Sequence, residues 1–180
     1  MPIASSDIVF RYSTTAGSAG DSTAGTGAGS LGKYAANNAI TTAVLNNLWD
    51  DVTGAEASAG DVEYRCVFIL NNHATLTLIN PNIYITSQTA GGGTIDIGLD
   101  TTAISAKGSA TAQAVTIANE ATAPSGVTFS SPTSGSPLAL GADLAPGQVK
   151  GIWIRRTVTA GASAVNPDGA IIGWGGDTNA

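Results

Sequence analysis

One stretch of this sequence approaches the pattern of a phosphate-binding loop. Residues 27–33 read Gly-Ala-Gly-Ser-Leu-Gly-Lys, which gives the two glycines and the lysine of that motif at the required spacing. The next position needs a serine or threonine hydroxyl to hold a magnesium ion, but it is Tyr34. Low-complexity sequence also separates these glycines from the strand predicted before them. We therefore interpret the glycines as a source of flexibility and expect no nucleotide or other cofactor.

Other residues able to perform catalysis are few and isolated. His73 is the only histidine, so a cluster of histidine metal ligands is impossible, and no Gly-x-Ser-x-Gly elbow exists for it to serve. Paired carboxylates can hydrolyse glycosides or bind calcium. Here Asp50 and Asp51 end a predicted helix, and Asp61 and Glu63 begin a predicted strand. No Asp-x-Asp-x-Asp-Gly loop is present. We expect neither a catalytic nor a metal site, and the protein is not predicted to be an enzyme.

Aromatic and basic side chains supply the candidate interaction residues. Three tryptophans could form a platform for sugar stacking, but large rings usually contribute buried area in a core or a subunit contact, which is the interpretation we favour. Three of the seven basic residues share one predicted strand, where they would pair with an adjacent subunit or guard an exposed edge. The candidates are Tyr34, Trp49, Lys150, Trp153, Arg155, Arg156 and Trp174.

Apolar residues that alternate along the chain predict a mainly β protein. Strands are expected over residues 7–12, 61–70, 75–79, 83–87, 90–100, 148–158 and 169–177, with a weaker one within 109–120. Asn71–His73 and Asn80–Asn82 read as turns between them. Short strands separated by turn signals are typical of an antiparallel β-sandwich or jelly roll.

Two segments depart from the strand pattern. Residues 40–52 carry apolar side chains at helical spacing and predict one short helix. Residues 13–33 are almost all Gly, Ser, Thr and Ala, so they have little to bury and cannot offset the entropy of ordering. We therefore divide the chain into an N-terminal strand with an extended flexible arm, residues 1–38, and a single sandwich domain, residues 39–180. The arm is expected to order only on contact with a neighbour.

The composition excludes several classes of partner. Only 11% of the 180 residues are charged, against roughly 25% in an ordinary globular protein, so the surface suits a protein covered by neighbours. The net charge is −6, which argues against nucleic-acid binding. No apolar run approaches the about 18 residues of a membrane span, and the N-terminus lacks a signal-peptide pattern. Cys66 lies in an apolar run and is predicted to be a buried, inert thiol.

Four stretches of the sequence carry a family resemblance. They are MPIASSDIVFRYSTTAGSAGDSTAGTGAGSLGKY, LNNLWDDVTGAEASAGDVEYRC, LAPGQVKGIWIRRTV and NPDGAIIGWGGDT. Together they resemble small virion structural proteins of tailed bacteriophages, including capsid decoration (cement) proteins. The resemblance implies a β-sandwich homotrimer on the capsid exterior. It also implies that the protein is made in the host cytoplasm, binds the major capsid protein and stabilises the shell. The alternative is a head-fibre, tail or baseplate component that binds a host glycan or receptor.

Overall fold

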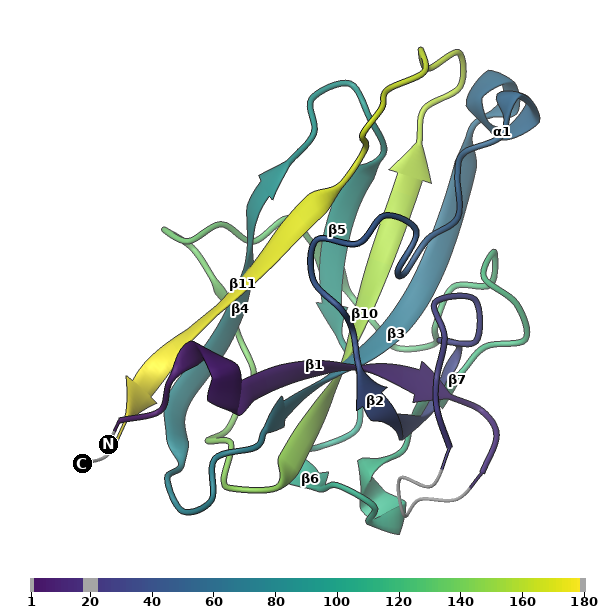
Figure 1. Ribbon diagram of the computed structural model, residues 1–180. Coiled ribbons are helices and arrows are strands. Elements are labelled where there is room, and N and C mark those ends of the chain that lie inside the picture. Colours follow the sequence, from purple (N-terminus) through teal and green to yellow (C-terminus); the bar gives the residue numbers. More distant parts are fainter. Residues whose placement is uncertain (1, 18–22, 179–180) are drawn as a thin grey trace.

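The computed structural model describes residues 2–17 and 23–178 and shows a mainly β protein built of two antiparallel sheets (Figure 1). The larger sheet has the strand order β7-β2-β1-β3-β10-β5-β8, with β6 paired to β10, and the smaller has the order β11-β4-β9. The sandwich class expected from the sequence is confirmed. The elements are η1 (Ser5–Asp7), β1 (Ile8–Thr14), β2 (Gly32–Ala39), α1 (Gly54–Ala59), β3 (Asp61–Asn71), β4 (Leu78–Gln88), β5 (Thr94–Leu99), β6 (Ser105–Ala106), η2 (Ala110–Ala112), β7 (Ala114–Thr116), β8 (Phe129–Ser130), β9 (Leu138–Ala139), β10 (Gln148–Val158) and β11 (Ala170–Thr178).

The central strands β3 and β10 are buried on both faces. They pair in continuous antiparallel register from Val149 opposite Leu70 to Val158 opposite Asp61. Alternation along each strand sends successive side chains to opposite faces. Phe68 therefore lies in a different apolar cluster from its neighbour Val67, and both are buried. The near-continuous apolar runs of these two strands are the sequence signature of this double burial.

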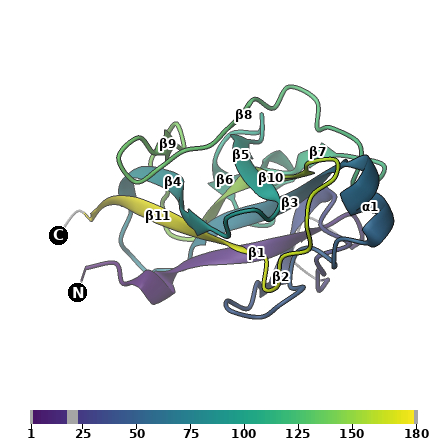
Figure 2. The same ribbon diagram turned by 90° about the horizontal axis from the view of Figure 1, so that it is seen from above.

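Two apolar clusters hold the molecule together, one on each face of the large sheet. The first fills the space between the sheets, where Val67 and Ile152 of the large sheet join Ile83 of the small sheet. The second lies on the opposite face around Phe68 and Trp153. It is covered by β2 and β7, because the large sheet curls into a half-barrel. The first 3-10 helix and the end of β11 lie at one end of the molecule, and α1 lies at the other (Figure 2).

The N-terminal region is part of this architecture. β1 pairs with β3, and β2 pairs with β1, so the boundary expected between residues 38 and 39 falls inside β2. Ser30 is fully buried, and the Asn37 backbone N–H donates to the Thr23 carbonyl at 3.0 Å. Residues 23–33 are therefore packed on the sheet, where the sequence predicted an extended flexible arm. Residues 18–22 of the expected arm lie outside the described residues.

The helix expected over residues 40–52 is not formed. That segment is a chain of turns, with left-handed backbone at Ala43 (φ 58°) and Asn46 (φ 57°), and the helix α1 begins two residues later. Thr53 and Glu56 form a capping box there, which satisfies the first free N–H groups of the helix. The helical spacing of apolar residues was misleading. Val44 and Leu45 are exposed, whereas Ile40, Leu48 and Trp49 pack against the apolar cluster from a loop.

The break expected at Asn80–Asn82 is also absent. β4 runs unbroken from Leu78 to Gln88 through Pro81. Asn80 takes a left-handed φ of 49°, and the register of the neighbouring strand β11 shifts between Gly175 and Asp177. The irregularity is thus absorbed as a bulge within one strand, so two predicted strands are a single one.

Candidate functional site

The phosphate-loop pattern does not form a phosphate cradle. Lys33 and Tyr34 lie in strand β2, where a nucleotide site would need the start of a helix. Gly32 has a φ of 96°, and a Cβ there would collide with the Val115 carbonyl oxygen. A Cβ at Gly27 would lie 2.7 Å from a backbone carbonyl oxygen of the 41–52 loop. These two glycines permit close backbone packing, which corrects the sequence interpretation that they supply flexibility.

The basic residues of β10 are paired within the chain. β10 lies in the middle of the sheet, so it is not the exposed edge considered from the sequence. Its register places Arg155 opposite Asp96 of β5, with Nη2 and Oδ2 2.6 Å apart, and Arg156 opposite Glu63 of β3, with Nε donating to Oε2 at 2.6 Å. Burial raises the pKa of Glu63, although Arg156 opposes the shift. The two arginines therefore pair with carboxylates of their own chain, where the sequence suggested carboxylates of an adjacent subunit.

Trp49 fastens the 41–52 loop to the large sheet. The guanidinium groups of Arg65 and Arg156 both lie over its ring, with their Cζ atoms 5.1 and 5.0 Å from the ring centroid. Arg156 Nη1 also donates to the Asp50 carbonyl at 2.8 Å, and Arg65 Nε donates to the Leu48 carbonyl at 3.3 Å. Two cation–π contacts and two hydrogen bonds therefore make Trp49 an internal anchor.

Trp153 is a core residue attached to a buried carboxylate. Its ring is fully buried, and its Nε1 donates to Asp100 Oδ2 at 2.8 Å. The same carboxylate accepts the backbone N–H groups of Thr102 and Val115 at 2.8 and 2.9 Å. Lys150 Nζ donates to the Asp100 carbonyl at 2.8 Å, and burial lowers the pKa of this lysine. Asp100 thus organises this part of the core, and sequence reasoning did not single it out.

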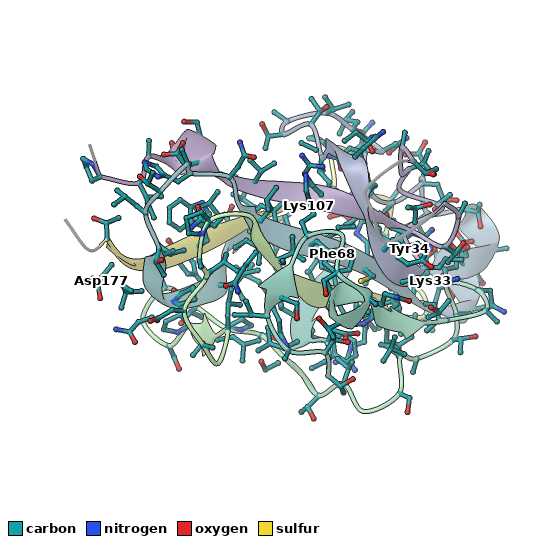
Figure 3. The ribbon with its side chains drawn as sticks, turned by 90° about the horizontal axis from the view of Figure 1, so that it is seen from below. Lys33, Tyr34, Phe68, Lys107 and Asp177 are labelled. Carbon is teal, nitrogen blue, oxygen red and sulfur yellow. The ribbon has the colours of Figure 1, made fainter. Side chains whose placement is uncertain are left out.

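The two remaining candidates lie on different sheets. Trp174 is half-buried on β11 and packs against the cluster between the sheets. Tyr34 is half-buried on β2, with Lys33 Nζ 4.9 Å from its ring centroid. Figure 3 shows Tyr34 at the end of the molecule opposite to Asp177 of β11. Trp49 therefore meets Arg156, and Lys150 and Trp153 share Asp100, but the seven candidates do not converge on one site. The three tryptophans form no shared platform, because Trp153 is wholly buried.

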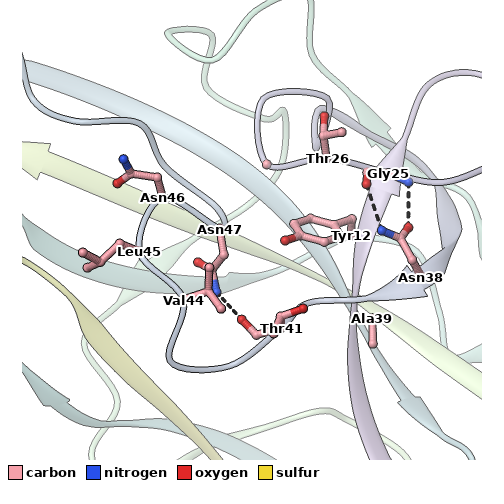
Figure 4. A pocket seen from close by; sticks show the side chains of 11 residues that line it. Tyr12, Gly25, Thr26, Asn38, Ala39, Thr41, Val44, Leu45, Asn46 and Asn47 are labelled. Carbon is pink, nitrogen blue, oxygen red and sulfur yellow. Dashed lines mark hydrogen bonds between the residues drawn. The ribbon is translucent and has the colours of Figure 1, made fainter.

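A hollow of about 380 Å³ on the described surface is a candidate ligand site (Figure 4). It lies between the 41–47 loop on one side and residues 25–27 with the end of β2 on the other, and Tyr12 of β1 lies between them. Its lining residues are Tyr12, Gly25, Thr26, Gly27, Asn38, Ala39, Thr41, Val44, Leu45, Asn46 and Asn47. We call it the Tyr12 hollow. None of these side chains is charged at neutral pH, and burial raises the pKa of the Tyr12 phenol.

Hydrogen bonds fix both walls of the Tyr12 hollow. The Asn38 amide joins Gly25 twice, since Gly25 N donates to Oδ1 at 2.8 Å and Nδ2 donates to the Gly25 carbonyl at 3.0 Å. On the opposite wall, Asn47 Nδ2 donates to the Thr41 carbonyl at 2.6 Å. Ala43 holds the loop turn in a left-handed conformation that costs a non-glycine residue about 1–2 kcal/mol. The sequence signal for this site was a cluster of asparagines beside a loop, which predicts turns equally well.

The remaining reactive residues have structural surroundings. Cys66 is fully buried, and burial raises the pKa of its thiol well above the usual value. His73 Nδ1 accepts the backbone N–H groups of Thr75 and Leu76, which fixes the ring in its turn. Across residues 2–17 and 23–178, no group of three or more His, Cys, Asp or Glu side chains is placed to hold a metal ion. The described helices include none long and apolar enough to cross a membrane.

Comparison of the chain with protein-family models, with curated proteins and with solved structures finds no match in any of the three.

Proposed function

We propose that this protein is a structural protein of a bacteriophage virion, of the capsid decoration (cement) type, which stabilises the head shell through contacts between subunits. The proposal rests on the resemblance of its sequence stretches and on one structural observation, the unequal edges of its sheets. The strands β7, β8 and β9 end their sheets with three, two and two residues, whereas β11 ends the small sheet with nine. One long edge is thus open to another chain.

The β11 edge lacks two of the devices that prevent strand pairing, charged side chains and proline, over most of its length. Residues 170–176 contain no charged side chain and no proline, and Ile171 is 61% exposed. Soluble proteins usually guard a long edge with lysine, proline or bulges. Register shifts at Ile171/Ile172 and Gly175/Asp177 leave a regular stretch between them. An added strand would gain backbone hydrogen bonds along that stretch.

The proposed assembly is a homotrimer on the capsid exterior, bound to the major capsid protein. The protein is made in the host cytoplasm and then incorporated into the virion. Its weakly charged surface supports this role, because charged residues are depleted in the cores of protein interfaces.

Removal of the protein from virions tests the role directly. Virions stripped of it, or assembled without it, would be compared with intact virions for survival of heat and osmotic shock and for adsorption to host cells. Loss of capsid integrity with normal adsorption is the expected result. Intact capsids with lost adsorption would overturn it in favour of a head-fibre, tail or baseplate component that binds a host glycan or receptor.

If copies of this chain associate through the β11 edge, a charge placed on that edge should weaken their association. Ile171→Lys places a charge on the β11 edge, and it should lower the oligomeric fraction of the purified protein measured by light scattering after size-exclusion chromatography. Leu45→Lys is the matched control, because Leu45 is 66% exposed in a loop. The two variants should therefore differ in association. Equal association of both variants would exclude β11 as the contact.

A further inference from the structure

The Tyr12 hollow has the chemistry of a site for an uncharged, hydroxyl-rich molecule. Its lining offers amide, hydroxyl and phenol groups with no charged side chain. A phosphate or carboxylate would find no opposite charge there, in a chain whose net charge is already −6. A sugar hydroxyl both donates and accepts hydrogen bonds, as does the side chain of asparagine or threonine.

Apolar groups stand beside these polar ones. Val44 and Leu45 are 51% and 66% exposed on the loop wall, and the Tyr12 ring lies between the two walls with its hydroxyl directed toward the loop (Figure 4). Sugars present C–H faces as well as hydroxyls, so they match a lining that mixes the two. The volume of about 380 Å³ falls at the lower end of the range of small-molecule sites, about 300–1,000 Å³.

The hollow is also shaped before any ligand arrives. The doubled Asn38–Gly25 hydrogen bonds hold one wall, and the Asn47–Thr41 hydrogen bond closes the loop that forms the other. Preformed walls reduce the ordering that binding would require. From this combination we infer that the Tyr12 hollow binds a neutral sugar residue of a glycan. The inference goes beyond the proposed function, because shell stabilisation requires no saccharide.

The test uses the full chain and two sets of probes. An array of bacterial surface oligosaccharides, neutral and acidic, would be screened first. The best neutral oligosaccharide, with glucose, galactose and N-acetylglucosamine, would then be titrated into ¹⁵N-labelled protein. We expect saturable shifts of the backbone amides of Gly25, Gly27 and Asn47, and weaker binding of galacturonic acid than of galactose. Absence of saturable shifts with every neutral probe, or shifts confined to other residues, would overturn the inference.

Two substitutions separate direct contact from a general effect on the fold. Tyr12→Phe removes the hydroxyl and keeps the ring, and it should weaken binding about tenfold. Thr41→Val removes a side-chain hydroxyl but keeps the carbonyl that Asn47 uses, and it should weaken binding severalfold. Tyr84→Phe is the control, because Tyr84 is a half-buried tyrosine on β4 that does not line the hollow, and it should bind as the native protein does. Native affinity in both test variants would overturn the inference.

Failure of this inference can be told apart from failure of the proposed function. Sugar binding is measured on the isolated chain, whereas shell stabilisation is measured on virions. Tyr12→Phe virions that lose sugar binding should keep their resistance to heat and osmotic shock.

Discussion

At the residue scale, the buried polar groups of this protein act as connections between strands. Asp100 follows β5 and accepts three hydrogen bonds, one from Trp153 and two from backbone N–H groups. Removal of such a group would leave its buried donors unsatisfied, which is costly in free energy. An aspartate directly after an apolar strand was the available sequence signal. It could not be interpreted without knowing that Trp153 lies beside it.

The pair formed by Asp96 and Arg155 predicts a dependence of stability on pH. Burial raises the pKa of Asp96, but the hydrogen bonds from Ser131 and Arg155 and the charge of Arg155 outweigh it, so the pKa lies below the usual value of 3.8. Stability from this group is therefore present above the pKa of the unfolded chain and is lost as pH falls through the lower folded pKa. The native protein should lose unfolding free energy when the pH falls from neutral to about 3. In Asp96→Asn this acid-induced loss should be smaller by about 1 kcal/mol.

Urea denaturation at the two pH values measures this effect. An unchanged acid loss in Asp96→Asn would contradict the prediction. Glu63 has the opposite sign, because burial raises the pKa of Glu63 and acidification through its folded pKa then favours the folded state. Glu63→Gln should therefore not reduce the acid loss, and it serves as the contrasting variant.

At the scale of elements, β3 is the strand on which both apolar clusters depend. Phe68 is 1% exposed within the cluster on the curled face of the large sheet. Phe68→Ala should lower the free energy of unfolding by about 3–5 kcal/mol, because it removes a buried ring and leaves a cavity. Val62→Ala on the same strand is the control. Val62 is 37% exposed, so that loss should stay near 0.5 kcal/mol. A loss below about 1 kcal/mol for Phe68→Ala would contradict its placement in the core.

The elements also show where local pattern is sufficient. β10 spans Gln148–Val158 as predicted, β11 lies within one residue of its expected range, and β5 begins four residues later than expected. Their apolar alternation is strong because their burial is extensive. The 40–52 loop was mistaken for a helix, since Leu48 and Trp49 are held by the sheet rather than by a helical repeat. Contacts with distant strands, rather than local helical spacing, therefore determine the conformation of that segment.

At the scale of the whole molecule, we predict that the two sheets unfold together. The clusters on the two faces share β3 and β10, so loss of one face exposes the other. Cys66 lies at 0% exposure on β3 and reports this event. In a urea titration, reactivity of the Cys66 thiol should appear at the same midpoint as the change in tryptophan fluorescence. Thiol reactivity at lower urea would instead indicate that the curled face opens separately.

By itself, the sequence determined the mainly β class and the absence of a complete phosphate-loop motif, because periodicity and motif spacing are local properties. The tertiary structure alone decided which charges meet. Arg156 and Glu63 are 93 residues apart in sequence and form a cross-strand pair. It also decided that Gly32 is needed for close backbone approach and that the Tyr12 hollow exists. These features depend on register and packing between distant segments, which no local pattern encodes.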